Sequence, residues 1–319
     1  MNVLVTGGLG FIGSNFYNYF SKKYPNYNVV ILDLNTYAAD INNIDDQKNA
    51  RIIKFSITDR ERVFTLFNSY KFDIVVHFAA ESHVDNSIEN PMEFINTNVI
   101  GTANLLDASV KYGVKLFYHI STDEVFGQLG ETGSFNEDTP YDPRSPYSAS
   151  KAASDHLVRA YYHTYKLPVV ISNCSNNYGQ NQHIEKLIPK VIKNILDGKQ
   201  IPIYGDGSNV RDWLYVTDHV EAIDLIIHNG KIGETYCIGG DNETTNLEIT
   251  KLICNKIDEV MMWDKKSEDL ITFVEDRKGN DFRYSIDYSK INRELGWKPK
   301  VGITEGIEKT INYYLKKFV

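Results

Sequence analysis

Two adjacent carboxylates follow an apolar stretch near the middle of the chain. The apolar run 114–120 leads through Ser121 and Thr122 into Asp123 and Glu124. Ligands of open α/β sheets bind at the carboxyl ends of the strands, and two carboxyl groups in different environments can serve as an acid and a base. Most Asp–Glu doublets are instead solvated or cap a helix. The doublet is thus a candidate acid–base pair at the end of a buried strand.

A second candidate pair is Tyr147 and Lys151, which lie four residues apart. On a helix this spacing places both side chains on one face. A nearby ammonium lowers the pKa of a phenol, so we expect Tyr147 to act as a base toward a substrate hydroxyl. The chain has 21 tyrosines, so such a spacing also arises by chance. Pro146 and the preceding residues 142–145 support the assignment because they form a credible helix start.

A glycine loop lies close to the N-terminus. Gly7, Gly10 and Gly13 directly follow an apolar run and precede a predicted helix. This arrangement allows a tight turn, a close approach of the backbone to a pyrophosphate and close packing of helix and strand. Asp33 ends the next apolar run, where a carboxylate accepts hydrogen bonds from ribose hydroxyls and repels a 2′-phosphate. The pattern therefore predicts an NAD site rather than an NADP site.

The elements that must hold these residues are short, nearly continuous apolar strands separated by helical stretches. Such strands are typical of a parallel sheet covered on both faces, and their alternation with helices predicts a Rossmann-type doubly wound α/β fold. Crossover helices are expected over 98–112 and 147–165. The expected strands are Val3–Thr6, Val29–Leu32, Ile52–Phe55, Ile74–Ala79, Leu116–Ile120 and Val169–Ser172.

The sequence also predicts two domains, because the strand–helix pattern becomes less regular after Cys174. We expect an NAD-binding domain over 1–172, with a return segment containing a strand at about 205–236. We expect a smaller mixed α/β substrate domain over 173–204 and 237–319.

Composition limits the function classes. The chain has 319 residues, a net charge of −8, 42% hydrophobic residues and three widely spaced cysteines. These values predict a cytoplasmic globular protein with reduced thiols and argue against a nucleic-acid-binding surface. We expect no membrane span, since no run of 18 apolar residues is present. The histidines have no metal-ligand spacing, so no metal site is expected.

The glycine loop together with the Tyr–Lys pair resembles the extended short-chain dehydrogenases/reductases, and the resemblance runs essentially the whole length of the chain. The acid–base doublet with the threonine before it, "TDE", resembles the signature of the nucleotide-sugar 4,6-dehydratases within that family. This resemblance implies that Asp123 is the acid toward a C6 hydroxyl and Glu124 the base at C5. It also implies that Thr122 binds the C4 oxygen, while Tyr147 starts the oxidation and Lys151 holds the cofactor ribose.

Further segments resemble the cofactor and substrate segments of those dehydratases, among them "HFAAESHVDNSIENP", "NCSNNYGQNQHIEKLIP" and "DGSNVRDWLYV". The resemblance implies that NAD is bound by Gly7, Gly10, Phe11, Ile12, Gly13, Asp33, Ile57, Phe78, Ala80, Thr97, Tyr147, Lys151 and Asn177. It implies that the nucleotide sugar is bound by Ser82, Thr122, Asn176, Lys186, Leu187, Pro202, Tyr204, Arg211, Asn246, Arg277 and Asn280. Arg211 is expected on the diphosphate, and Pro202 and Tyr204 beside the nucleobase.

Several positions depart from the common pattern and leave the nucleobase open. Ser56 replaces an Asp thought to bind adenine, and Asn86 replaces an Arg common in the dTDP-glucose enzymes. Asn280 replaces a His, as in some UDP-glucose 4,6-dehydratases. The predicted reaction is dehydration of dTDP-glucose to dTDP-4-keto-6-deoxy-glucose. UDP-glucose dehydration, C4 epimerisation and a catalytically silent NAD-binding scaffold remain as alternatives. The resemblance also implies a homodimer formed through a four-helix bundle.

Overall fold

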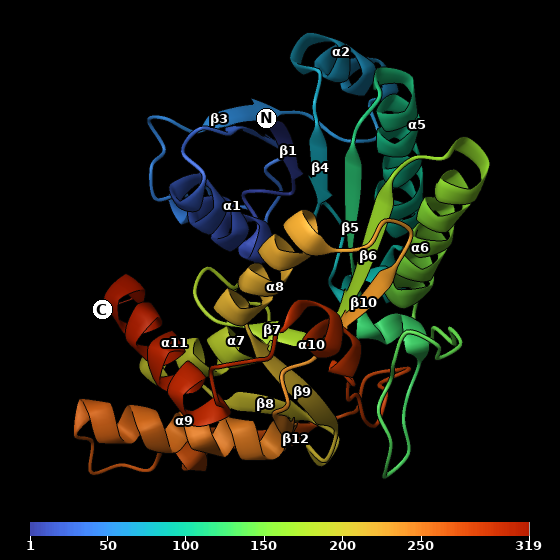
Figure 1. The fold of residues 1–319 in the computed structure, drawn as a ribbon. Helices are drawn as coiled ribbons and strands as arrows, with labels where there is room; N and C mark the ends of the chain where they lie inside the picture. The colour runs from blue at the N-terminus through green and yellow to red at the C-terminus, as the bar shows by residue number, and fades with distance from the viewer. Residues whose placement is uncertain (319) are drawn as a thin grey trace.

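The computed structural model describes residues 1–318, and its largest element is a seven-stranded sheet in the order β10-β6-β5-β4-β1-β2-β3 (Figure 1). All neighbouring strands in it are parallel. The predicted doubly wound parallel fold is therefore confirmed. The strands are β1 (Asn2–Thr6), β2 (Asn28–Asp33), β3 (Arg51–Lys54), β4 (Ile74–His77), β5 (Leu116–Thr122), β6 (Val169–Cys174) and β10 (Thr235–Ile238).

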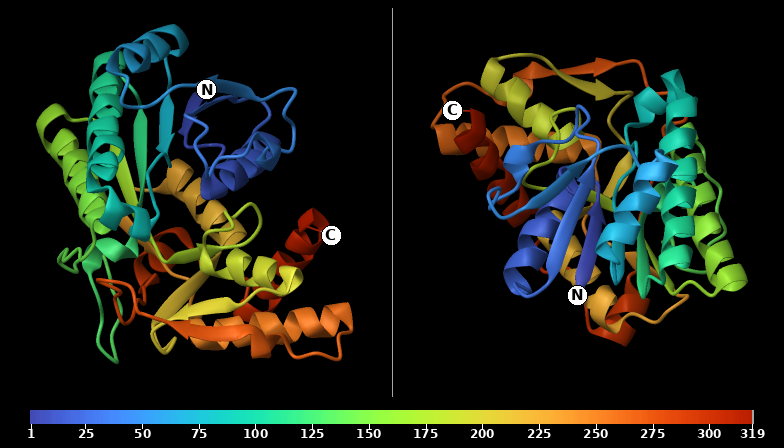
Figure 2. Two further views of the ribbon diagram at one scale, coloured as in Figure 1. Left: turned by 180° about the vertical axis from the view of Figure 1, so that it is seen from behind. Right: turned by 90° about the horizontal axis from the view of Figure 1, so that it is seen from above.

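Helices cover both faces of this sheet (Figure 2). Side chains alternate between the two faces of a strand. On β1, Val3 and Val5 accordingly belong to one core cluster and Leu4 to the opposite one. The first cluster includes residues of α1 (Phe11–Lys23) and α8 (Val216–Asn229), and the second includes residues of α2 (Arg60–Tyr70), α5 (Thr102–Tyr112) and α6 (Pro146–Tyr165). This burial on two faces explains why the strands are continuous in apolar residues.

The crossover from β4 to β5 is long and contains several helical segments. It runs through α3 (Val84–Glu89), α4 (Pro91–Phe94), the π-helical segment η2 (Ile95–Gly101) and α5. Three short 3₁₀ turns lie elsewhere, at η1 (Ile41–Asn43), η3 (Asp123–Phe126) and η4 (Ser267–Leu270). Among residues 1–318, no helix has both the length and the apolar character needed to cross a membrane.

The second half of the chain adds two small sheets and their helices. One sheet has the order β11-β9-β7 and the other pairs β12 with β8. Their strands are β7 (Asn176–Tyr178), β8 (Ile201–Tyr204), β9 (Val210–Tyr215), β11 (Glu243–Thr245) and β12 (Ile271–Val274). A third core cluster joins them to α7 (Leu187–Asp197), α9 (Asn246–Met261) and α11 (Ile303–Phe318), while α10 (Ser289–Leu295) lies against β10.

The segment 205–236 divides between these two parts. Its first strand, β9, belongs to the β11-β9-β7 sheet, whereas α8 packs on α1 and β10, which starts at Thr235, pairs with β6. The strand that returns to the large sheet is therefore β10, at the end of the segment. The division into an NAD-binding domain and a substrate domain stays a prediction.

Candidate active site

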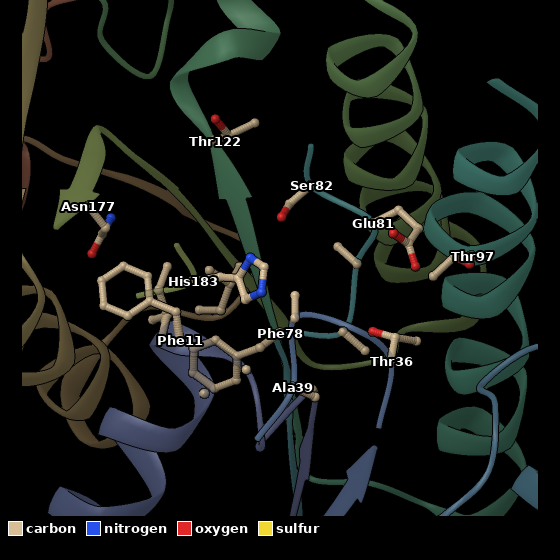
Figure 3. A pocket seen from close by; sticks show the side chains of 18 of the residues that line it. Phe11, Thr36, Ala39, Phe78, Glu81, Ser82, Thr97, Thr122, Asn177 and His183 are labelled. Carbon is tan, nitrogen blue, oxygen red and sulfur yellow. The ribbon is translucent and has the colours of Figure 1, made fainter. Parts of the chain in front are cut away.

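A cavity of about 340 Å³ lies at the carboxyl ends of the central strands. Figure 3 shows Thr122 at the end of its strand, with Asn177 and Ser82 on either side. The cavity brings together every residue predicted to bind the cofactor: Gly7, Gly10, Phe11, Ile12, Gly13, Asp33, Ile57, Phe78, Ala80, Thr97, Tyr147, Lys151 and Asn177. Its other walls include Thr122, Asp123 and Glu124.

The glycine loop forms one wall of the cavity and leaves no room for side chains. Gly7 has φ of +70°, and a Cβ there would lie 2.6 Å from the backbone nitrogen of Ala79. A Cβ on Gly13 would lie 2.2 Å from the carbonyl oxygen of Gly7. Helix α1 begins directly after Gly10, which provides no side-chain cap for the first amides. Free N–H groups at a helix N-terminus bind phosphate, so this wall fits a dinucleotide pyrophosphate.

Asp33 lies at the end of β2, beside the glycine loop, and is 8% exposed. Its Oδ2 accepts a hydrogen bond from the Leu9 N–H at 3.0 Å, and its Oδ1 accepts one from the Asn35 N–H at 2.7 Å. Each carboxylate oxygen accepts more than one hydrogen bond. The side chain is therefore fixed in place and still has lone pairs for ribose hydroxyls.

The acid–base doublet lies where β5 passes into the 3₁₀ turn η3. The Thr122 hydroxyl donates to Asp123 Oδ1 at 3.2 Å and accepts from the Glu124 N–H at 3.2 Å. Asp123 is 2% exposed, and within residues 1–318 its buried Oδ2 has no hydrogen-bond partner. Leaving a buried polar atom unpaired costs stability, so this oxygen marks a place where a substrate group can bind.

The two carboxyl groups have different electrostatic surroundings. Burial, followed by the negative charge of Glu124, raises the pKa of Asp123 well above its ordinary value. Burial also raises the pKa of Glu124, but the positive charges of Lys186, Arg211 and Arg277 act against that rise. Asp123 is therefore suited to carry a proton and Glu124 to accept one.

Tyr147 and Lys151 lie on the first turns of α6. A capping box formed by Ser145 and Ser148 starts this helix, as the helix-start signal predicts. Lys151 Nζ donates to the carbonyl oxygen of Ile120 at 2.8 Å. Burial raises the pKa of Tyr147 well above its ordinary value, and the negative charge of Glu124 adds to this effect. Burial therefore outweighs the effect of the Lys151 ammonium on the phenol pKa in this arrangement, and the role of Tyr147 as a base stays a prediction.

The predicted substrate residues fall into two groups. Ser82, Thr122, Asn176 and Lys186 line the cavity, whereas the remaining ones lie outside its lining: Leu187, Pro202, Tyr204, Arg211, Asn246, Arg277 and Asn280. The Lys186 ammonium donates to the Ser82 carbonyl at 2.9 Å. Arg211 is 8% exposed and donates to the side-chain oxygen of Asn280 at 3.1 Å. Arg277 Nε lies 3.1 Å from a carboxylate oxygen of Asp85.

The cavity also has polar lining residues outside the predicted sets. Among them are Glu81, Cys174, Gln182, His183 and Glu185. In Figure 3 the Glu81 carboxylate lies near Thr97. Glu185 directly precedes the predicted Lys186, and Cys174 lies two residues before the predicted Asn176. Closeness in sequence to a predicted residue was thus the available signal, but it does not show which neighbours face inward.

Comparison with known proteins agrees with this geometry. The model of the GDP-mannose 4,6 dehydratase family matches residues 4–310. The dTDP-glucose 4,6-dehydratase of Haemophilus influenzae is 48% identical over 99% of this chain and 98% of its own. The chain belongs to the dTDP-glucose 4,6-dehydratase family. The predicted family is therefore confirmed.

Solved structures extend the likeness to three dimensions. The dTDP-glucose 4,6-dehydratase of Bacillus anthracis in complex with NAD matches with a TM-score of 0.90 and 43% identity, over 100% of this chain and 97% of that one. A UDP-glucose 4-epimerase from Thermotoga maritima matches with a TM-score of 0.91 but 31% identity, over 100% of both chains. Since an epimerase has the same fold, the site residues must distinguish the two reactions.

Proposed function

We propose that this protein catalyses the NAD-dependent conversion of dTDP-glucose to dTDP-4-keto-6-deoxy-glucose and water. The observation that carries the proposal is the doublet Asp123–Glu124, whose members lie side by side in the cavity but in different electrostatic surroundings. Oxidation and reduction at C4 alone, as in an epimerase, do not require such an acid–base pair. Removal of water across C5 and C6 requires both an acid and a base.

NAD fits the wall built by the glycine loop and Asp33, where a Cβ on Gly13 would meet the Gly7 carbonyl. In this proposal the α1 N-terminus binds the pyrophosphate, Asp33 the adenosine ribose and Lys151 the second ribose. When bound, the cofactor supplies a reversible hydride acceptor. The carboxylate of Asp33 disfavours a 2′-phosphate and thus NADP.

Three side chains handle the protons of the reaction. Tyr147 would accept the proton of the C4 hydroxyl as the C4 hydride leaves for the cofactor, with the positive charge of bound oxidised NAD offsetting the burial that raises the phenol pKa. Thr122 would hydrogen-bond the C4 oxygen as it becomes a ketone. The ketone makes the C5 proton acidic, and Glu124 removes it. Asp123 donates its proton to the C6 hydroxyl, so the C6–O bond breaks and water leaves. Reduction at C6 and return of a proton to C5 complete the change, whose net result is the loss of one water molecule.

The nucleotide diphosphate requires cations near the sugar. Lys186, Arg211 and Arg277 all act electrostatically on Glu124, which supports a cationic site next to the base. Arginine binds phosphate with two parallel hydrogen bonds. We assign the sugar to Ser82 and Asn176, and the outer nucleotide contacts to Leu187, Pro202, Tyr204, Asn246 and Asn280.

Mass spectrometry of the product tests the reaction. Purified protein with NAD and dTDP-glucose is expected to give a product lighter by one water, whereas a C4-epimerase leaves the mass unchanged. A parallel assay with UDP-glucose tests the nucleobase, and we expect a higher kcat/KM for dTDP-glucose. No loss of water from either sugar nucleotide would contradict the proposal.

We also propose that the protein forms a homodimer through helices that cover one face of the large sheet. Helices α4 and α6 and the segment η2 contact one another, and Met92, Ile95 and Tyr165 on them are exposed. Exposed apolar side chains of this kind are typical of an interface. Light scattering should give twice the chain mass, and Met92→Glu with Ile95→Glu should give a monomer.

A further inference from the structure

A buried carboxylate behind the active site has no part in the reaction described above. Asp155 lies on α6, four residues after Lys151 and eight after Tyr147, so the three side chains share one face of the helix. Asp155 has 0% exposure and is absent from the cavity lining. A buried ionised group is costly unless it is paired and hydrogen-bonded, so its contacts indicate what it does.

The contacts of Asp155 join α6 to the strand ends that hold the acid–base doublet. The hydroxyls of Ser121 and Tyr141 each donate to Asp155 Oδ2 at 2.8 Å. Ser121 directly precedes Thr122 on β5. The Asn173 amide on β6 lies 3.3 Å from the same oxygen and donates to the Thr122 carbonyl at 3.0 Å. The carboxylate thus links the helix of Tyr147 to the strand of Thr122.

The carboxylate also provides a negative charge beside the buried Lys151. His119 Nε2 lies 3.1 Å from Asp155 Oδ1, but burial and the charge of Lys151 lower the pKa of His119 to about 4, so this histidine is neutral at pH 7. Burial acts to lower the pKa of Lys151, and the charge of Asp155 opposes it. Burial acts to raise the pKa of Asp155, yet its contacts, including those with His119 and Lys151, bring it below its ordinary value.

We propose that Asp155 is a positioning residue for this reaction, which fixes Lys151 and the Thr122–Glu124 segment relative to Tyr147 and balances the charge of Lys151. The inference rests on the roles proposed above for Tyr147 and Lys151. Asp155 acts through these groups and does not contact the substrate. A carboxylate with a purely structural role would affect stability but would leave the ionisation of the catalytic groups unchanged.

Asp155→Asn tests the proposal because it removes the charge and keeps the shape. Removing a nearby negative charge lowers the pKa of each ionisable neighbour. C4 oxidation is followed by NADH absorbance in single turnovers at a series of pH values. Its rate rises on the acid side of the profile and falls on the basic side, and both of these limbs should move to lower pH by about one unit or more. We expect kcat to fall about tenfold or more, with little change in KM for dTDP-glucose, because the substrate contacts remain.

The matched controls are Tyr141→Phe and Ser121→Ala, which each remove one hydrogen bond and keep the carboxylate. Neither should move the profile to lower pH. The other ionisable or charged groups near this site are His77, His119 and Cys174 on the strands, Asp123 and Glu124 in η3 and Arg159 on α6, and all six are unchanged in these variants. A folded Asp155→Asn protein that binds NAD and keeps the wild-type profile would overturn the proposal.

A second variant decides the question if Asp155→Asn does not fold. The double variant Ser121→Ala, Tyr141→Phe keeps the charge of Asp155 but removes two of the hydrogen bonds that hold it against the strand ends. The rate of C4 oxidation should therefore fall while the pH profile keeps its position, and an unchanged rate would overturn the proposal. NADH formation reports these changes independently of water loss, so failure of the inference and failure of the proposed dehydration are distinguishable.

Discussion

Glu124→Gln separates the two halves of the proposed reaction. Glutamine has the same shape but cannot accept the C5 proton, and loss of a general base costs on the order of 10²-fold or more. The Thr122 hydrogen bond to the backbone N–H of residue 124 does not involve the side chain, so the local geometry should persist. We therefore expect C4 oxidation to continue while elimination slows at least 10²-fold.

The structure also predicts a pH effect of this substitution. The negative charge of Glu124 is the second largest cause of the raised pKa of Tyr147. Without that charge the phenol loses its proton at lower pH, so the acid limb of C4 oxidation should move to lower pH. The direction follows because a nearby negative charge disfavours a second negative charge.

Rapid mixing with dTDP-glucose measures both steps. NADH absorbance reports the oxidation, and exchange of the C5 hydrogen with solvent deuterium reports the base. In the variant, NADH should accumulate and C5 exchange should be lost, whereas Asp123→Asn should retain C5 exchange and lose water release. An equal loss of oxidation and exchange in Glu124→Gln would refute the assigned role, and so would an unmoved acid limb.

Three further predictions concern the cofactor wall and stability. Gly13→Ala, whose Cβ would lie 2.2 Å from the Gly7 carbonyl, should abolish NAD binding in a fluorescence titration, while the folded far-ultraviolet spectrum remains. Asp33→Asn should reduce the preference for NAD over NADP about tenfold, measured as the ratio of their Kd values, because the repelling charge is lost. Asp218→Ala should lower the free energy of unfolding by about 2–4 kcal/mol, measured by urea titration, since its buried carboxylate accepts two backbone N–H bonds at 2.8 Å from residues 300–301.

Much of the large sheet could be predicted from the sequence. Each of the six expected strands corresponds to an observed strand, because burial on two faces makes a parallel strand a continuous apolar run. Strand β9, Val210–Tyr215, was less informative, since its mixed sequence does not show which sheet it joins. That assignment depends on its pairing with β7 and β11. Both of these strands are short and mostly polar, and both lie well away from β9 along the chain.

The site could be predicted in part, for a similar reason. The glycine loop and the doublet are local patterns, so their spacing indicates their chemistry. The raised pKa of Tyr147 depends on burial by segments far along the chain, and the sequence shows only the neighbouring Lys151. Asp155 continues the four-residue spacing of Tyr147 and Lys151, but its role depends on donors from Ser121 and Tyr141.

The position of strand β10 affects the order in which the large sheet can form during synthesis of the chain. This strand forms one outer edge of the large sheet and pairs with β6. Three strands of the small sheets, β7, β8 and β9, lie between β6 and β10 in the sequence. Until Thr235–Ile238 is synthesised, the buried residues Ile171, Ser172, Asn173 and Cys174 of β6 have no partner strand on that side. Open apolar edges are templates for pairing with other chains. We therefore expect a chain truncated after β6 to aggregate more readily than one that also contains β10.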